Sequence, residues 1–451
     1  MNVKAIFPPG ITNKIIHPLR CRLNSWHKNV ATISNYIKKN EYCTNEDLYN
    51  LQKKKLKNLC IQASKNCPYY KNRFEAAGVL PEKIGLDTLS KMPAVDKKDI
   101  RENFDNILNP NYPKEFLIKN ATGGSSGEPL QYYNSRHTAI FSSALYKRGL
   151  DWAGMHPGDP HVKLWGAPTD VQKISVGLKN RLWNYLYNRS IIDAFNVSHE
   201  LFENQYHDFA KHPPAMLESY PNILYEFACY LKEKDKKPLS IGAVISSAGV
   251  LYDFQREVIQ ETISKNVFNR YGSREFGNIA QECDHHTGMH INMERFVVEI
   301  DTPDNNGTGD ILVTDLENTA FPFIRYRIGD TGRISKNLCT CGRKSFLFEN
   351  VIGRSLDIIK TPSGRMISGE IFPHFFKDFP QIILGQVVQD KKDHLEIRLK
   401  LKRGSSVLHI EPLIKKIKDT IGNEMKVSVN TEKDFVSNPT GKYRPVISNI
   451  K

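Results

Sequence analysis

The sequence has no long hydrophobic run. No stretch approaches the roughly 18 consecutive apolar residues that a membrane-spanning helix needs, so we expect none. Pro8, Pro9 and Gly10 stand where a signal peptide would need its apolar stretch, so we do not expect secretion. The eight cysteines are irregularly spaced and do not resemble a disulfide framework. These features predict a reduced, cytoplasmic protein.

Positive charge is what the sequence has in excess. Its 451 residues include 63 Lys and Arg against 49 Asp and Glu, a net charge of +14. The excess lies at the two ends: residues 1–60 carry 11 basic and 3 acidic residues, and residues 354–451 carry 18 and 11. Such charge suits nucleic acid, a membrane surface or an anionic small molecule. The near-neutral centre offers no basic stripe with interleaved aromatics, so we expect no nucleic-acid partner. Peripheral contact of residues 1–60 with anionic lipid stays open.

The first clear element is a predicted helix over residues 44–66. Thr44 and Asp47 form a capping-box-like start. Leucines then recur at a spacing that places them on one face, at Leu48, Leu51, Leu56 and Leu59. Lysines 53–55 would form its solvated side.

The chain after residue 100 predicts an α/β fold. Short apolar runs, expected as strands, alternate with helical stretches. The predicted strands are 241–247, 267–270, 296–300, 311–314 and 323–326, with a helix at 251–264. After a Gly- and Pro-punctuated break at 351–364, strands at 382–388 and 395–401 and a helix at 412–421 indicate a small α+β domain. We thus divide the chain into a basic helical N-terminal extension (1–60), a large α/β domain (61–353) and a small C-terminal domain (354–451).

The densest chemical signal is the loop at residues 121–129, which reads ATGGSSGEP. Three glycines and three hydroxyl residues can wrap backbone N–H groups and hydroxyls around a phosphate. No lysine follows the last glycine, so this is not a Walker P-loop, and it does not match GxGxxG. Taken alone, the loop is equally well interpreted as a flexible polar connection.

Four more motifs follow in order along the chain. They are YGSREFG at 271–277, YRIGD at 326–330, IGRSLD at 352–357 and NPTGKYR at 438–444. The ordered set resembles the adenylate-forming (acyl-CoA synthetase) superfamily, and within it the branch of phenylacetate–CoA ligases and CapK-type proteins. The resemblance covers about residues 60–448. It implies a large adenylation domain, a small mobile C-terminal domain, and ATP bound between them.

The resemblance also implies roles for the motif residues. The loop would hold the β- and γ-phosphates of ATP through Thr122, Gly123, Gly124, Ser125, Ser126 and Gly127. Nucleotide-side positions would be Ser247, Ala248, Gly249, Tyr271, Gly272, Ser273 and Arg274. A carboxylate is a hard ligand suited to Mg²⁺, the role implied for Glu275.

Three further positions complete the implied site. Asp330 would accept hydrogen bonds from the ribose hydroxyls; a turn residue is the structural alternative. Arg354 would face the nucleotide or the hinge. Lys442 is the implied catalytic residue, because an ammonium stabilises the charge that develops on the α-phosphate and pyrophosphate. Two positions depart from the family pattern: Arg274 replaces a usual Thr, and Leu356 replaces a usual polar hinge residue.

The implied reaction converts a carboxylic acid and ATP into acyl-AMP, from which CoA takes the acyl group. An alternative acceptor is a sugar amine or a carrier in capsular or surface polysaccharide biosynthesis. The implied acyl pocket lies within residues 165–250, where Trp165, Phe195, Tyr220 and Ile245 are equally good core residues. These residues do not identify the acid.

A second cluster of residues suggests a metal site. Cys283 and His290 lie in ECDHHTGMH, and Cys339 and Cys341 lie in CTCGR. Together they offer the ligands of a closed Cys3His site with a structural Zn²⁺. His285 and His286 are alternative ligands, and free thiols are the simpler interpretation.

Overall fold

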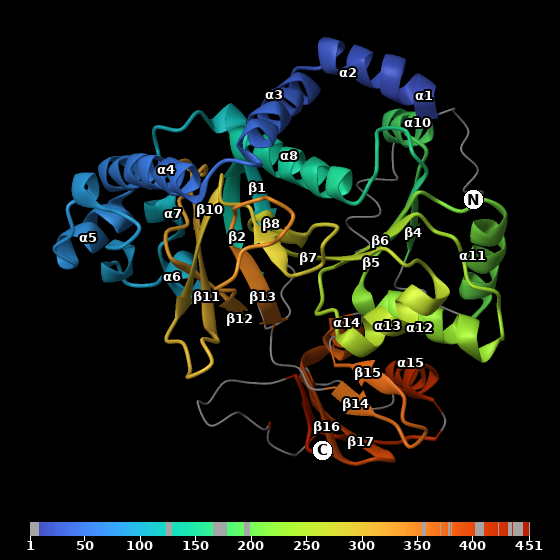
Figure 1. Ribbon diagram of the computed structural model, residues 1–451. Helices are drawn as coiled ribbons and strands as arrows, with labels where there is room; N and C mark the ends of the chain where they lie inside the picture. The colour runs from blue at the N-terminus through green and yellow to red at the C-terminus, as the bar shows by residue number, and fades with distance from the viewer. Residues whose placement is uncertain are drawn as a thin grey trace. The chain divides into compact units, whose positions relative to one another are not determined.

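The computed structural model describes residues 9–122, 129–165, 178–193, 199–353, 358–369, 371–377, 379, 381–401, 410–422, 424–431, 435 and 445–450. The chain forms two compact units, one from residues 1–122 and 130–352 and one from residues 353–451 (Figure 1). Residues 9–60 belong to the first unit. The predicted division of the chain at residues 60 and 353 stays a prediction. Within the described ranges, no helix is long and apolar enough to cross a membrane.

One mixed sheet organises the first unit. Among the described residues it has eleven strands, in the order β10-β11-β12-β13-β9-β8-β7-β6-β5-β3-β4. Its parallel half consists of β3 (His161–Trp165), β4 (Arg189–Asp193), β5 (Met216–Ser219), β6 (Ala243–Ser247) and β7 (Val267–Ser273). The other strands are β8 (Gly277–Glu282), β9 (Met289–Ile291), β10 (Phe296–Asp301), β11 (Gly309–Asp315), β12 (Tyr326–Ile334) and β13 (Leu347–Gly353). A separate antiparallel pair joins β1 (Leu117–Ala121) to β2 (Gln131–Ser135).

Helices cover both faces of the parallel half (Figure 1). On one face, α8 (Arg136–Trp152) contributes Leu150 to a core that includes Met216, Ile245 and Phe268. On the other face lie α11 (His199–Lys211), α12 (Pro221–Glu233) and α13 (Asp253–Thr262), whose apolar residues pack with those of β3, β5 and β6. Strands buried on both faces are apolar almost continuously. That pattern made β6 predictable from sequence. The helix predicted at 251–264 is confirmed as α13.

The antiparallel half packs against N-terminal helices. These are α3 (Ser25–Asn40), α4 (Asn45–Asn66), α5 (Pro68–Ala76), α6 (Lys97–Glu102) and α7 (Phe104–Ile107). The predicted helix at 44–66 is confirmed as α4, with its capping box between Thr44 and Asp47. The placement of all three lysines on the solvated side was wrong for Lys55. Its ammonium forms an ion pair with Glu317 and donates to the Glu294 carbonyl at 2.7 Å.

One strand differs from its prediction. We expected a strand at 323–326, but β12 begins at Tyr326 and continues to Ile334. Arg325 interrupts the chain there with a left-handed backbone, φ +52°. Its side chain makes this turn favourable by donating to Glu299 and to the Met92 carbonyl. Because β12 extends to Ile334, Asp330 lies inside a strand instead of after one.

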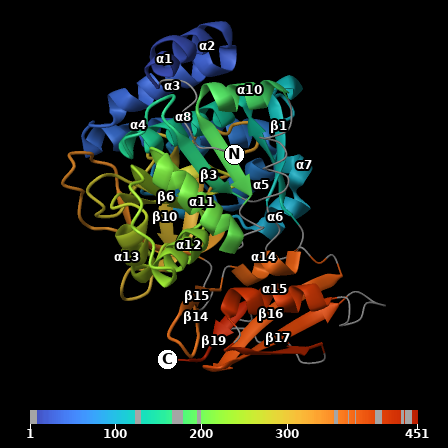
Figure 2. The ribbon, with the colours of Figure 1, turned by 90° about the vertical axis from the view of Figure 1, so that its right-hand side faces the viewer.

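The second unit is an α+β structure. Its four-stranded sheet has the order β18-β17-β16-β19, and a hairpin joins β14 to β15. Figure 2 shows the two helices packed over this sheet. The elements are β14 (Ile358–Lys360), β15 (Met366–Ser368), α14 (Ile371–Lys377), β16 (Ile382–Lys391), β17 (His394–Leu401), α15 (Glu411–Ile421), β18 (Lys426–Asn430) and β19 (Val446–Ser448). The predicted α/β class with a C-terminal unit is confirmed.

A buried ionic cluster connects the parallel strands of the first unit. The Glu218 carboxylate on β5 pairs with Arg270 of β7, with Lys163 of β3 at 3.0 Å, and accepts from the Tyr146 hydroxyl of α8 at 2.6 Å. Burial alone raises the pKa of Glu218, but the charges of Arg270 and Lys163 outweigh burial and hold this pKa well below its usual range. Glu218 is therefore an anion shared by two cations.

Removal of this anion gives a test of its contribution. Glu218→Gln keeps the volume but leaves Lys163 and Arg270 without their shared partner. We expect the free energy of unfolding at neutral pH to fall by about 3–5 kcal/mol, measured by urea denaturation. Glu261→Gln is the matched control, because its ion pair with Lys232 is exposed to solvent and its loss should change the free energy of unfolding far less.

The pH dependence of stability, compared between wild type and Glu218→Gln, gives a second test. A carboxylate such as Glu218, whose pKa is lower in the folded than in the unfolded state, stabilises the fold at pH values above its unfolded-state pKa of about 4.3. This stabilisation is lost as the pH falls through the folded-state pKa. The stability difference between wild type and Glu218→Gln should be constant near neutrality and shrink below about pH 4. A difference that stays constant through acid unfolding contradicts the assignment.

Candidate nucleotide site and Cys3His cluster

Two of the predicted nucleotide segments lie side by side at the carboxyl ends of β6 and β7. Ser247 pairs with Arg270 in the parallel ladder, and the Arg270 Nε donates to Ser247 Oγ at 3.2 Å. The next residue, Ala248, adopts a left-handed backbone with φ +61°, which turns the chain away from the sheet. Open α/β sheets bind ligands at this edge.

Tyr271 and Asp330 are brought together from opposite halves of the sheet. The Tyr271 hydroxyl donates to Asp330 Oδ2 at 2.9 Å, which joins β7 to β12. Both side chains are half-buried. An aromatic face, which can stack on a base, and a carboxylate, which can accept from sugar hydroxyls, thus lie next to each other.

Gly272 is required by a close approach of two backbones. The register of β7 against β8 shifts between Tyr271 and Gly272. A Cβ at Gly272 would lie 2.1 Å from the carbonyl oxygen of Gly277, a distance that no side chain can adopt. Only glycine allows β8 to begin this close to the end of β7.

Glu275 lies in the turn between β7 and β8 and is 5% exposed. Its Oε1 accepts from the Tyr326 hydroxyl at 3.1 Å. In the same turn, the Arg274 carbonyl accepts from the Tyr132 hydroxyl at 2.5 Å, and Ser273 Oγ accepts from the Phe276 N–H at 3.3 Å. These bonds hold the turn in one conformation. Among the described residues, Glu275 has no cationic side chain as a partner.

Of the residues predicted to hold phosphate, 122–127, Thr122 alone lies within the described residues. It pairs with Leu130 through two bonds of 2.9 Å, one of them to its hydroxyl, where β1 leads to β2. The other predicted positions lie outside the described residues: Gly123, Gly124, Ser125, Ser126, Gly127, Arg354, Leu356 and Lys442.

The predicted acyl-pocket residues have different environments. Trp165, at the end of β3, stacks on Tyr220, with ring centroids 4.5 Å apart and an interplanar angle of 17°. Ile245 is fully buried in the core beneath α8, so it packs the sheet there. Phe195 lies outside the described residues.

The four predicted metal ligands converge. The ligand atoms of Cys283, His290, Cys339 and Cys341 all lie within 4.8 Å of one another. The sulfurs of Cys283 and Cys339 are 3.7 Å apart, and Cys341 Sγ lies 3.4 Å from His290 Nε2. A tetrahedral zinc ion with Zn–S bonds of about 2.3 Å requires S···S distances of about 3.8 Å. The spacing therefore fits this metal.

The surroundings of the cluster favour neutral imidazole and select His290 over its neighbours. Burial lowers the pKa of His290 to about 4. Its Nδ1 lies 2.9 Å from Ser345 Oγ, a contact that directs Nε2 toward the thiols. The alternatives His285 and His286 instead contact Thr340 at 2.8 Å and Glu282 at 3.2 Å.

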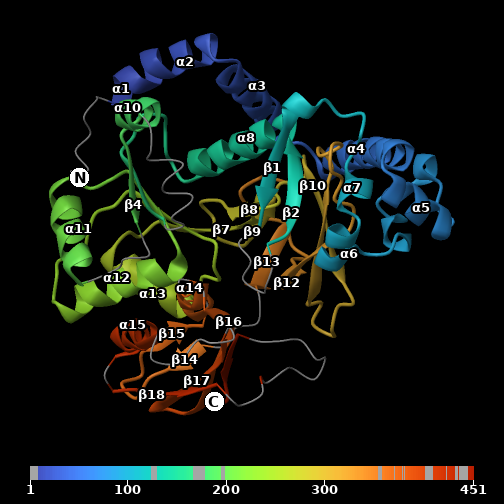
Figure 3. The same ribbon diagram turned by 180° about the vertical axis from the view of Figure 1, so that it is seen from behind.

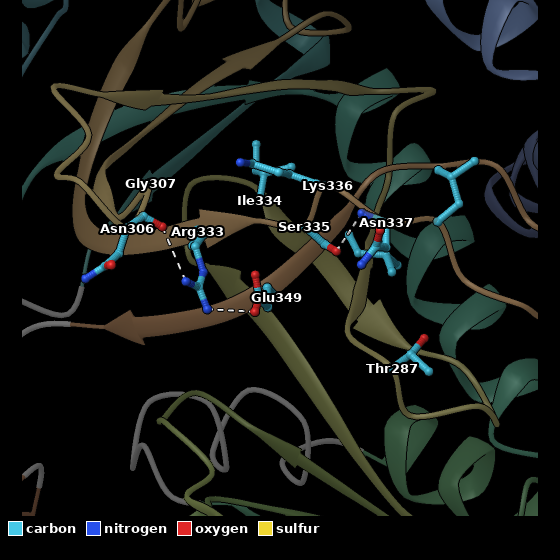
Figure 4. A pocket seen from close by; sticks show the side chains of 11 residues that line it. Thr287, Asn306, Gly307, Arg333, Ile334, Ser335, Lys336, Asn337 and Glu349 are labelled. Carbon is cyan, nitrogen blue, oxygen red and sulfur yellow. Dashed lines mark hydrogen bonds and ion pairs between the residues drawn. The ribbon is translucent and has the colours of Figure 1, made fainter.

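A polar pocket of about 590 Å³ lies beside the cluster. Arg333 lines this pocket; as Figure 4 shows, its guanidinium pairs with Glu349 at 2.6 Å and donates to the Asn306 carbonyl at 3.3 Å. Thr287 lines the same pocket and donates to Cys339 Sγ. The lining of this pocket includes none of the predicted nucleotide residues.

The residues that support the strand ends and the Glu275 turn were not assigned such roles from the sequence. Glu218, Lys163 and Arg270 lie beneath the strand ends, and Tyr132 and Tyr326 hold the Glu275 turn. Charged residues inside apolar strand runs, such as Lys163 and Glu218, are a signal that was available in the sequence.

Comparisons with known proteins agree with the predicted resemblance. The family model of the CapK C-terminal domain matches residues 359–449. The protein CapK of Staphylococcus aureus is 24% identical over 414 residues, 90% of either chain. A phenylacetate-coenzyme A ligase of Thermus thermophilus is 23% identical over 89% of this chain and 96% of its own, and that of Escherichia coli K12 is 25% identical over 80% and 84%.

Solved structures extend the likeness to the fold. The structure of 2-hydroxyisobutyryl-CoA ligase with 2-HIB-AMP and CoA, in the thioesterification state, has a TM-score of 0.62 at 17% identity, over 91% of either chain. The same ligase in the postadenylation state has a TM-score of 0.58. The predicted similarity to CapK, to phenylacetate-CoA ligases and to the adenylate-forming fold is confirmed.

Proposed function

We propose that this protein activates a carboxylic acid as acyl-AMP at the expense of ATP and transfers the acyl group to CoA. The observation that carries the proposal is the hydrogen bond between Tyr271 and Asp330, because it joins the two predicted nucleoside-binding motifs across the sheet. The similarity to CoA ligases over most of the chain supports the same reaction.

Each residue at the carboxyl edge has a proposed task. Tyr271 presents an aromatic face to the adenine, and Gly272 keeps the β7–β8 turn beside it tight, because the Gly277 carbonyl occupies the place of a side chain. Asp330 accepts hydrogen bonds from the ribose hydroxyls, for which Tyr271 holds it in place. Arg354 and the phosphate loop of Thr122 and residues 123–127 have the roles that the family resemblance implies.

Glu275 is the proposed Mg²⁺ ligand. A buried carboxylate with a tyrosine partner and no cationic partner among the described residues fits a site completed by a cation. Bound Mg²⁺ would neutralise phosphate charge during adenylation. The neighbouring Arg274 is exposed, and we propose that it adds positive charge next to the nucleotide.

The acceptor has a second candidate. CapK of Staphylococcus aureus is among the relatives, and the C-terminal unit matches the CapK model. The family resemblance implies a sugar amine or carrier of a capsular or surface-polysaccharide pathway as the alternative acceptor. We place the reaction in the cytoplasm, in keeping with eight cysteines that are all free in the described residues.

Pyrophosphate release across a library of carboxylic acids tests the activity and identifies the acid. We expect release with ATP and Mg²⁺ to depend on one class of acid. With that acid, CoA should then stimulate AMP release. Stimulation by amino sugars with no response to CoA would establish the alternative acceptor, and no acid-dependent release from any compound would reject the proposal.

Lys442→Ala separates the two half-reactions. The ammonium is proposed to stabilise phosphate charge during adenylation only, so acyl-AMP formation should fall at least about 100-fold. Thioester formation from supplied acyl-AMP and CoA should remain largely intact, measured as thioester by chromatography. Equal losses in both half-reactions contradict this division. Lys451→Ala is the matched control, since it also removes a C-terminal lysine.

We further propose that Cys283, His290, Cys339 and Cys341 hold a structural Zn²⁺. Burial raises the pKa of the Cys283 thiol to about 12, and a bound cation would reverse this preference by stabilising the thiolate. The metal would join the connection between β8 and β9 to the loop between β12 and β13. Its role is to hold these loops, with no part in the chemistry.

Metal analysis of protein purified without added zinc tests this site. We expect about one zinc per chain in the wild type and a strong loss in Cys341→Ser, with a melting temperature lower by several degrees. Cys43→Ser, outside the cluster, should keep its zinc. Wild-type protein without stoichiometric zinc rejects the proposal.

A further inference from the structure

The N-terminal segment, residues 9–23, is a continuous helical stretch whose less exposed residues, apart from Ile16, are mostly polar. It comprises α1 (Pro9–Ile11), the π-helical turn η1 (Thr12–Ile16) and α2 (His17–Leu23), and it lies beside α10 (Leu178–Leu186) (Figure 1, Figure 3). The hydroxyl of Thr12 donates to the Leu186 carbonyl at 2.9 Å, and Arg20 lies 4.0 Å above the Trp183 ring. Polar contacts therefore attach this segment to α10.

The outward side of the N-terminal segment is apolar. Its large side chains recur every four residues: Ile11, Ile15, Leu19 and Leu23 are 42%, 61%, 52% and 78% exposed. On the neighbouring α10, Leu182 and Tyr185 are also exposed, at 55% and 45%. A surface helix normally buries its apolar side and exposes its polar side, and here the arrangement is reversed. Such an exposed stripe marks an interaction surface.

The charge around this stripe is of one sign. Residues 1–40 include seven Lys and Arg and no Asp or Glu. Lys14 and Arg22 are exposed and lie in sequence next to Ile15 and Leu23, and Lys28 is exposed at the start of α3. Exposed apolar side chains bordered by basic ones match the two layers of a membrane surface, the acyl chains and the anionic headgroups.

We propose that the N-terminal segment docks the protein on an anionic lipid surface, with Ile15 and Leu19 inserted and Lys14 and Arg22 at the headgroups. Charge decides against a second copy of the chain, since a symmetric contact would place this basic region against itself. The segment would lie on the bilayer without crossing it. This inference is independent of the proposed enzymatic reaction.

Vesicle sedimentation of the full chain tests the docking surface. We expect binding to vesicles with about 30% phosphatidylglycerol in phosphatidylcholine, much weaker binding to pure phosphatidylcholine, and weakening at about 0.5 M salt. Lys14→Gln and Arg22→Gln should each weaken binding about fivefold. The double variant Ile15→Ser/Leu19→Ser should weaken it at least about tenfold.

The matched control replaces apolar residues of similar exposure elsewhere on the first unit. Leu80→Ser/Phe116→Ser changes side chains that are 55% and 41% exposed and should bind vesicles like the wild type. Vesicle binding that survives Ile15→Ser/Leu19→Ser, or equal binding to neutral vesicles, overturns the proposal. It is also overturned if vesicles do not bind and Ile15→Ser/Leu19→Ser instead dissolves a dimer in analytical ultracentrifugation.

Discussion

The ion pairs and the hydrogen bond made by the buried Glu218 carboxylate align the elements of the candidate site. It receives bonds from β3, β7 and α8, and through Arg270 it reaches Ser247 on β6. Apolar contacts between strands tolerate small shifts, whereas buried hydrogen bonds to a charge do so only at high cost. The strand ends that carry Ser247, Tyr271 and Trp165 are therefore held level with one another.

A single strand, β12, connects this edge to the Cys3His cluster. Asp330 in β12 accepts the bond from Tyr271, and Tyr326 at its start holds Glu275. The loop that follows β12 carries Cys339 and Cys341. A metal bound there would fix the loop after the strand whose Tyr326 and Asp330 contact the proposed nucleotide residues. The proposed structural metal and the proposed nucleotide edge are thus linked through β12.

Features with a local signal could be predicted from the sequence, whereas features that depend on residues distant in the chain could not. The helix α4 and the strand β6 were predictable because a capping box, leucine spacing and a continuous apolar run are local signals. The Cys3His cluster was predictable because its ligand types are distinctive. Lys55, the start of β12 and the Glu218 cluster were not, since each depends on a partner distant in sequence, such as Glu317 for Lys55. The reversed polarity of residues 9–23 likewise appears only once α10 is in place beside them. Lys442 and residues 123–127 keep roles that come from the family resemblance alone.

Formation of acyl-AMP requires a carboxylate oxygen to attack the α-phosphorus of ATP. This attack can be followed with the acid substrate labelled with ¹⁸O in its carboxylate, by mass spectrometry of the products after acyl transfer. Cleavage of the acyl-AMP leaves the bridging oxygen on phosphorus, so we expect AMP that carries one ¹⁸O atom. Label in orthophosphate together with ADP, or AMP without label, would contradict it.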